Sequence, residues 1–373
     1  MQTFIMRAAA VLLCAAVFIL LPLKAAAQDG YDYGREALED AVPPEAAAVL
    51  DGKGIDPDSS GAEDLSFGGA VAYLWELVCE RTAAPLRLLL SLCGVILLCA
   101  VTGAAADNGQ DSTVKLFSAV GVLAGSGMTA AALSDILTEA LELLSAASVF
   151  ITTFIPIFAG ILSVMGRTAS ASAVNAVTLA ATQLFSQLAV NLLAPLCGTI
   201  MGLAITGAIH PQLDTAKLGE SIRKAVVWAL GLLMTLFMSI LSVQTVVTGS
   251  ADSMLIRTAK FAVSSGVPLI GGTISDAVAT VHGGLALIKS SVGTFGIIAA
   301  AVMILPTLVS VTCYRLAIGA AEAVSDIFGT KELSALLKSG GAVVSIISAV
   351  IACFLLLNTI AAVIMLAMGS GIA

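Results

Sequence analysis

Three side-chain amides recur at every fourth position of one apolar stretch. They are Gln183, Gln187 and Asn191, and Asn175 lies eight residues before the first of them. On a helix of 3.6 residues per turn the three lie within about 80° of one another, with Asn175 towards one edge of the same face. Such amides either hydrogen-bond across helices or line a polar conduit, because acyl chains cannot pair with them. These four residues are the predicted polar lining.

Asp276 is the acidic residue whose setting most suggests a function. It lies in the segment "GGTISDAVATVHGGLALI", with Lys260 and Lys289 as candidate partners. An ionisable group inside a membrane is costly and commonly marks a functional path. The alternative interpretation is that this segment lies at the membrane interface, where the charge is in water.

Catalytic and metal-binding patterns are missing from the sequence. His210 and His282 are 72 residues apart, and neither belongs to an HExxH pattern. The chain has no GxSxG elbow and no Walker A loop. We therefore predict that the protein is not an enzyme and uses no cofactor and no metal. The lysines and arginines form no cluster of the kind that nucleic-acid binding needs.

Two segments repeat a proline–glycine pattern inside long apolar runs. They are "TFIPIFAGILS" (153–163) and "SGVPLIGGTIS" (265–275). Proline removes a backbone donor and glycine eases departure from a helix, so each segment is a candidate helix break. The break residues are Pro156, Gly160, Pro268, Gly271 and Gly272. Paired breaks favour a pseudo-symmetric transport core, here with half-repeats of about 140–250 and 252–369. The alternative is a proline kink that packing tolerates.

The composition of the chain indicates which environment surrounds these segments. Of 373 residues, 58% are hydrophobic and 11% are charged, with a mean hydropathy of +1.03. Soluble domains carry roughly 25% charged residues. The chain is therefore predicted to be a membrane protein that contacts the lipid bilayer.

The N-terminal part is expected to be exported. Residues 1–27 combine Arg7, an apolar core and the small residues Ala25 to Ala27, which is typical of a cleaved signal peptide. An uncleaved first anchor is the alternative. Residues 28–84 form an acidic arm outside the cytoplasm, which is either a docking arm for a partner or a solvated linker.

Residues 85–373 are predicted to form an all-α polytopic membrane helical bundle. It contains about seven to nine hydrophobic segments, some of them broken or re-entrant, because windows of about 20 apolar residues recur. The eight clearest segments are 85–106, 114–133, 141–165, 171–190, 192–209, 225–247, 292–316 and 341–368, with a weaker ninth at 261–288. Small residues crowd these segments, and they allow helix backbones to approach closely.

The orientation of the segments follows from lysine and arginine in short loops. We expect two crossings within 171–209, turning near Asn191 and Pro195. With the acidic arm outside, Lys115 is in a cytoplasmic loop after the first segment and Arg167 is cytoplasmic after the third. The second segment leads to an outside loop that carries Asp135, Glu139 and Glu142. The weaker segment at 261–288 is expected to form an outside-facing hairpin or re-entrant element.

Three stretches carry a resemblance to a known family. The order "FIPIFAGILS", then "IRTAKFAVSSGVPLIGGTISDAV" (256–278) and "LIKSSVGTFGIIA" (287–299), follows a signal peptide and an acidic arm. This arrangement resembles the stage III sporulation protein AE family of endospore-forming Firmicutes, over essentially the whole chain. Gly266 departs from the bulky residue expected before the Val-Pro pair.

The resemblance implies a role in sporulation. A member would be a multi-pass protein of the mother-cell membrane around the forespore, and one part of a multiprotein channel that supports late forespore gene expression. Its implied partners are other products of the same operon, including a cytoplasmic secretion-type ATPase and a partner in the forespore membrane. The charged stretches 217–224 and 315–338 would be available to cytoplasmic partners. A permease-like or platform role fits this setting, whereas an independent secondary transporter and a purely structural scaffold are the alternatives.

Overall fold

The computed structural model describes residues 35–52, 55, 67–106, 111–209, 215–266 and 271–368. The described residues form helices and short connections, without strands. In chain order the helices are α2 (Arg35–Asp40), α3 (Pro44–Gly52), α4 (Phe67–Arg81), α5 (Ala83–Ala106), α6 (Asp111–Val164), α7 (Thr168–Leu188), η2 (Ala189–Leu193), α8 (Ala194–Ile209), α9 (Thr215–Gly266), α10 (Gly271–Ile327) and α11 (Lys331–Ala367). The predicted signal peptide lies outside the described residues.

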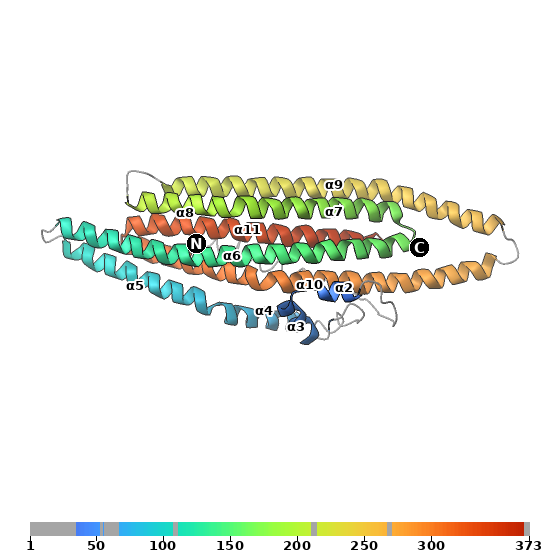
Figure 1. Cartoon of the computed structure of the whole chain (residues 1–373), viewed down its shortest axis with the longest axis horizontal. Helices are drawn as coiled ribbons and strands as arrows, with labels where there is room; N and C mark the ends of the chain where they lie inside the picture. Colours follow the sequence, from blue (N-terminus) through green and yellow to red (C-terminus); the bar gives the residue numbers. More distant parts are fainter. Residues whose placement is uncertain are drawn as a thin grey trace.

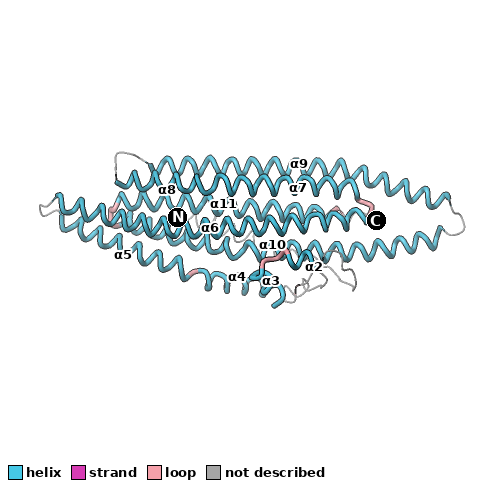
Figure 2. The backbone as a smooth tube through the Cα atoms, viewed as in Figure 1, coloured by secondary structure: helices cyan, strands magenta, loops and turns pink. Residues whose placement is uncertain are grey.

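Long helices lie side by side in an elongated bundle (Figure 1). The end of α5 and the start of α6, the end of α8 and the start of α9, and the turn from α10 to α11 lie towards one end of it, which we call the α11-start end (Figure 2). The turn from α6 to α7 lies towards the opposite end, and α9 and α10 extend beyond it (Figure 1). The predicted all-α polytopic fold is confirmed, because six stretches are long and apolar enough to cross a membrane.

The described residues contain six candidate spans, fewer than the predicted seven to nine hydrophobic segments. The six candidate spans are Ala83–Thr102, Ala119–Val164, Thr168–Gly207, Lys217–Met254, Ser290–Ile327 and Lys331–Ala367. The predicted segments 114–133 and 141–165 are joined in α6, a helix of 54 residues. At 1.5 Å per residue it is about 80 Å long, well beyond the roughly 30 Å of a hydrocarbon core.

The acidic residues between those two segments explain why α6 continues. Asp135, Glu139 and Glu142 suggested a loop, but no proline or glycine accompanies them. The apolar residues around these acids are buried at helical spacing, namely Leu133, Ile136, Ala140 and Leu144. A buried apolar stripe with charges on the other face is the pattern of an amphipathic helix. Lys115 lies near the start of α6, and Arg167 follows its other end. The expectation that both are cytoplasmic stays a prediction.

The expected turn near Asn191 and Pro195 is also replaced by continuous helix. One π-helical turn, η2, joins α7 to α8, and Pro195 is the second residue of α8. A π turn accommodates an extra residue without ending the helix, and such turns occur where the regular backbone hydrogen bonding of an α-helix is locally changed. The 171–209 stretch is therefore a single candidate span rather than two.

The weaker segment includes the end of one helix and the start of the next. Residues 261–266 end α9 and residues 271–288 belong to the start of α10, the two helices that extend past the bundle (Figure 1). Residue 140 lies inside α6 and residue 250 lies inside α9. The expected hairpin and the half-repeats stay predictions.

The centre of the bundle is packed around aromatic rings on α6. Phe150, Phe154 and Phe158 stack in sequence, with ring centroids 5.8 and 5.6 Å apart. All three side chains are fully buried or nearly so. Gly293 and Gly296 of α10 face these rings, and a Cβ on Gly296 would lie 2.1 Å from Phe154 Cε2. The absence of a side chain at these glycines lets α10 approach α6 closely.

The acidic arm packs on the bundle rather than standing apart from it. Leu38 of α2 and Leu50 of α3 are buried in the same apolar cluster as the central helices. Arg81 at the end of α4 forms an ion pair with Glu139 of α6 at 3.3 Å, and both side chains are about one-third exposed. The arm is thereby held against α6 and α10, where Figure 1 shows α2, α3 and α4.

The Arg81–Glu139 ion pair is expected to contribute little to stability. Replacement Glu139→Gln should lower the free energy of unfolding by less than about 1 kcal/mol, because exposed ion pairs are screened by water and salt. Thermal unfolding of the purified protein at low and high salt measures this. A loss of several kcal/mol would show that the arm depends on this one contact.

Candidate functional site

The two proline–glycine segments have different structural settings. Pro156 lies inside α6, which continues through it, and its side chain is exposed. The expected break at Pro156 and Gly160 is therefore absent. One missing backbone hydrogen bond does not end a helix whose opposite face holds buried phenylalanine rings on either side of the proline.

The second segment lies where one helix ends and another begins. Pro268 is outside the described residues, between the end of α9 at Gly266 and the start of α10 at Gly271. Gly271 and Gly272 open α10. The two segments therefore do not occupy matching positions in the described helices, as a repeated break would require.

The four amides of the predicted polar lining do not share one surface. Gln183, Gln187 and Asn191 are exposed, and Asn191 Nδ2 donates to Gln187 Oε1 at 3.1 Å. Asn175 is half-buried, and its Oδ1 is buried with no hydrogen-bond partner among the described residues. Three amides therefore face outward from the bundle, and the fourth reaches inward.

Asp276 lies on the first turns of α10, close to the end that extends beyond the other helices (Figure 1). Its side chain is outside the described part of the chain, as are those of Lys260 and Lys289. Their proposed pairing stays a prediction.

A buried carboxylate that the sequence did not single out connects α9 to α7. Asp252 is fully buried, and it accepts the backbone N–H of Ala169 at 3.0 Å and of Ser170 at 2.9 Å. Ser170 Oγ also donates to Thr248 Oγ1 at 3.1 Å. Asp252 thus caps the N-terminus of α7 from another helix, where unpaired N–H groups favour an anion. The sequence feature that could have pointed to this cap is an acidic residue, Asp252, within the long apolar run of α9.

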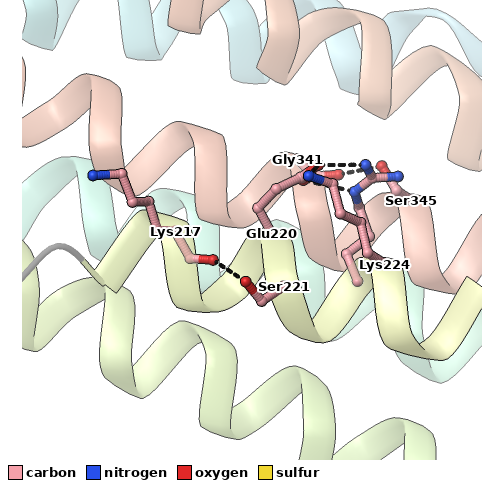
Figure 3. A network of polar contacts seen from close by, with 7 residues as sticks. Lys217, Glu220, Ser221, Lys224, Gly341 and Ser345 are labelled. Atoms are coloured by element: carbon pink, nitrogen blue, oxygen red, sulfur yellow. Dashed lines mark hydrogen bonds and ion pairs between the residues drawn. The ribbon is translucent and has the colours of Figure 1, made fainter.

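Two charged segments far apart in the sequence meet near the α11-start end. The start of α9 carries Glu220, to which Arg223 donates from Nε at 2.7 Å and from Nη2 at 2.5 Å, and Lys224 Nζ lies 3.7 Å away (Figure 3). Lys338 of α11 lies within electrostatic reach of both Glu220 and Glu322. The predicted partner segments 217–224 and 315–338 therefore form one charged cluster.

Close backbone packing fixes this cluster in place. A Cβ on Gly219 would lie 3.3 Å from Ile200 Cγ2 of α8 and 3.8 Å from Ser339 Oγ of α11. The turn from α10 to α11 is held by Thr330 N donating to the Ser325 carbonyl at 3.1 Å. Ser334 Oγ donates to Asp326 Oδ1 at 2.5 Å across the same turn. The α9 and α11 starts are thus rigidly juxtaposed.

The exposed charges of the cluster are mostly basic. Lys217, Lys224, Lys331 and Lys338 are exposed, as is Asp326, whereas Glu220, Glu322 and Glu332 are half-buried. A solvated lysine carries its charge on a long flexible stem, so these four ammonium groups dominate the outer field. We call these four residues the lysine face.

Metal chemistry has no candidate in the described part of the chain, where no group of three or more His, Cys, Asp or Glu could hold an ion. The arrangement as a whole offers a membrane-spanning bundle with a charged surface near one end.

Comparison with known proteins agrees with these features. The family model for stage III sporulation protein AE matches residues 53–369. The stage III sporulation protein AE of Bacillus subtilis (strain 168) is 29% identical over 160 residues, which are 43% of this chain and 39% of that relative. No solved structure matches the chain. Because the family model matches most of its length, the chain belongs to the stage III sporulation protein AE family.

Proposed function

We propose that this protein is the membrane platform of a multiprotein sporulation channel, in the mother-cell membrane that surrounds the forespore. Membership of the family and the six apolar candidate spans support a role in sporulation at a membrane. The N-terminal arm is outside the cytoplasm in this proposal, and the lysine face is inside. Other stage III sporulation proteins, including a forespore-membrane partner, complete the channel.

The observation that carries the proposal is the meeting of two distant charged segments. The start of α9 and the α10–α11 turn come together beside a rigid helix contact at Gly219. Four exposed lysines on these segments suit an acidic protein surface, since complementary charges steer association and set orientation. A cytoplasmic secretion-type ATPase is the partner that we assign to this face.

Charge reversal of the lysine face tests this assignment. The variant Lys217→Glu, Lys224→Glu and Lys338→Glu should bind the ATPase about a hundredfold more weakly, because like charges now oppose each other. It should also yield far fewer heat-resistant spores while the protein still accumulates in the membrane. Binding is measured by titrating the purified ATPase onto the full-length protein in nanodiscs.

The matched control replaces the same three lysines by arginine, which keeps the positive charge. Normal binding and sporulation of the charge-reversed protein would contradict the platform role of this face. Movement of a solute into vesicles that contain this protein alone would instead favour an independent secondary transporter. Sporulation that tolerates reversal but fails when the acidic arm is removed would favour a structural scaffold.

A further inference from the structure

A polar stripe on α7 is buried inside the bundle. Asn175, Thr178 and Thr182 are spaced by three and four residues, so they lie on one face of the helix. Thr182 Oγ1 donates to Asn358 Oδ1 of α11 at 3.4 Å, and Asn358 Nδ2 donates to the Phe354 carbonyl at 2.9 Å. We call these four residues the α7–α11 seam.

The seam contains polar atoms that no described protein group satisfies. Thr178 is fully buried, and its hydroxyl has no hydrogen-bond partner among the described residues. The buried Oδ1 of Asn175, one turn away, also has no hydrogen-bond partner among the described residues. Leaving a buried polar group unpaired destabilises a protein appreciably, and native proteins rarely do so.

A third unsatisfied group lies at similar depth on α9. Gln244 Oε1 is also buried without a described partner. The contact between Asp252 and Ser170 gives a common reference level for α9 and α7. Gln244 lies eight residues before Asp252, and Asn175 lies five residues after Ser170. At 1.5 Å per residue these offsets are about 12 and 8 Å along the two antiparallel helices, so the two amides lie at nearly the same level. Unpaired acceptors therefore gather in one layer of the bundle.

We propose that the α7–α11 seam binds ordered water molecules, which hydrogen-bond to Thr178 and Asn175 and hydrate the interior of the bundle. Buried water typically bonds to polar groups that protein atoms leave unsatisfied. Asn175 is half-buried, so its side chain lies nearer the surface of the bundle than that of Thr178. The ligand class is water. This inference does not rest on the proposed sporulation assembly, so the two tests fail separately.

The experiment compares two buried positions on α7 in a full-length protein whose native cysteines are replaced by alanine. Thr178→Cys lies in the seam, and Val174→Cys lies one turn away; both native side chains are fully buried. The probe is 2-aminoethyl methanethiosulfonate, a small water-soluble thiol reagent, and intact-mass spectrometry counts the modified fraction over time in nanodiscs. The thiol at 178 should react at least tenfold faster than the thiol at 174.

Equal and slow labelling at both positions would overturn the proposal, because a dry seam admits no aqueous reagent to either. If the cysteine variant does not fold, the Tm of Thr178→Val tests the proposal instead. Valine has nearly the shape of threonine but lacks the hydroxyl. With water bound to the hydroxyl, this variant should have an unchanged or lower Tm. A raised Tm would overturn the proposal, because it would mean that an unsatisfied hydroxyl in a dry core had been removed.

Discussion

Replacing Gly296 by alanine should destabilise the protein by about 1–3 kcal/mol, the usual cost of overpacking a well-filled core. The added Cβ would lie 2.1 Å from Phe154 Cε2 and 2.2 Å from Phe154 Cζ. Phe154 cannot easily move aside, because its ring stacks between Phe150 and Phe158 and is 1% exposed. Alanine favours a helix over glycine by about 1 kcal/mol, which offsets only part of the overlap.

The matched control is Gly319→Ala on the same helix. A Cβ at Gly319 would meet nothing within 4 Å. This variant gains helix propensity without overlap, so it should leave the Tm unchanged or raise it slightly. Thermal unfolding of both purified proteins in the same detergent gives the comparison. A Tm for Gly296→Ala equal to that for Gly319→Ala would show that α10 does not approach α6 as closely as described.

Loss of the Asp252 carboxylate should have a similarly large effect. Asp252→Ala leaves the Ala169 and Ser170 N–H groups without their acceptor in a fully buried place. A lost cap together with unpaired buried donors should cost about 2–3 kcal/mol. Asp252→Asn retains one acceptor oxygen and should lose less.

Hydrogen exchange distinguishes this cap from a general packing defect. The amides of Ala169 and Ser170 should lose protection in Asp252→Ala more than the amides in the middle of α11 do. The control Ser253→Ala changes the next residue, which is exposed and donates only to the Gly249 carbonyl of its own helix. Its unfolding free energy should change by less than about 0.5 kcal/mol. Uniform loss of protection along the chain in Asp252→Ala would contradict a local capping role.

Local sequence reasoning failed where helix continuity depends on neighbouring helices. The acidic stretch of α6 suggested a loop, yet its apolar residues recur at helical spacing and are buried by packing. The repeated proline–glycine pattern suggested paired breaks, yet Pro156 lies on an exposed helix face, where one missing hydrogen bond is tolerated. In each case tertiary packing determined whether a local weakness ended the helix.

The candidate site was partly visible in the sequence. The charged stretches at 217–224 and 315–338 were predicted to be available to partners, but their meeting near Glu220 and Lys338 depends on how α9 packs against α11. Asn175 was predicted to belong to a polar lining, whereas Thr178, Thr182 and Asn358 were not singled out. Threonine is common in membrane helices with its hydroxyl bonded to its own backbone, so its spacing carries little signal.

The sequence by itself determined that this chain is an all-α membrane protein, because its composition and long apolar runs favour helices with internally paired backbone. Its match to the family model, which is also read from the sequence, places it in the stage III sporulation protein AE family. Tertiary structure alone decided how many helices those runs form, which side of each faces the interior, and that Asp252 caps α7. The physical reason is that apolar runs are alike in composition wherever they pack. Their partners are chosen by contacts between residues about a hundred or more positions apart, such as Gly296 with Phe154 and Thr182 with Asn358.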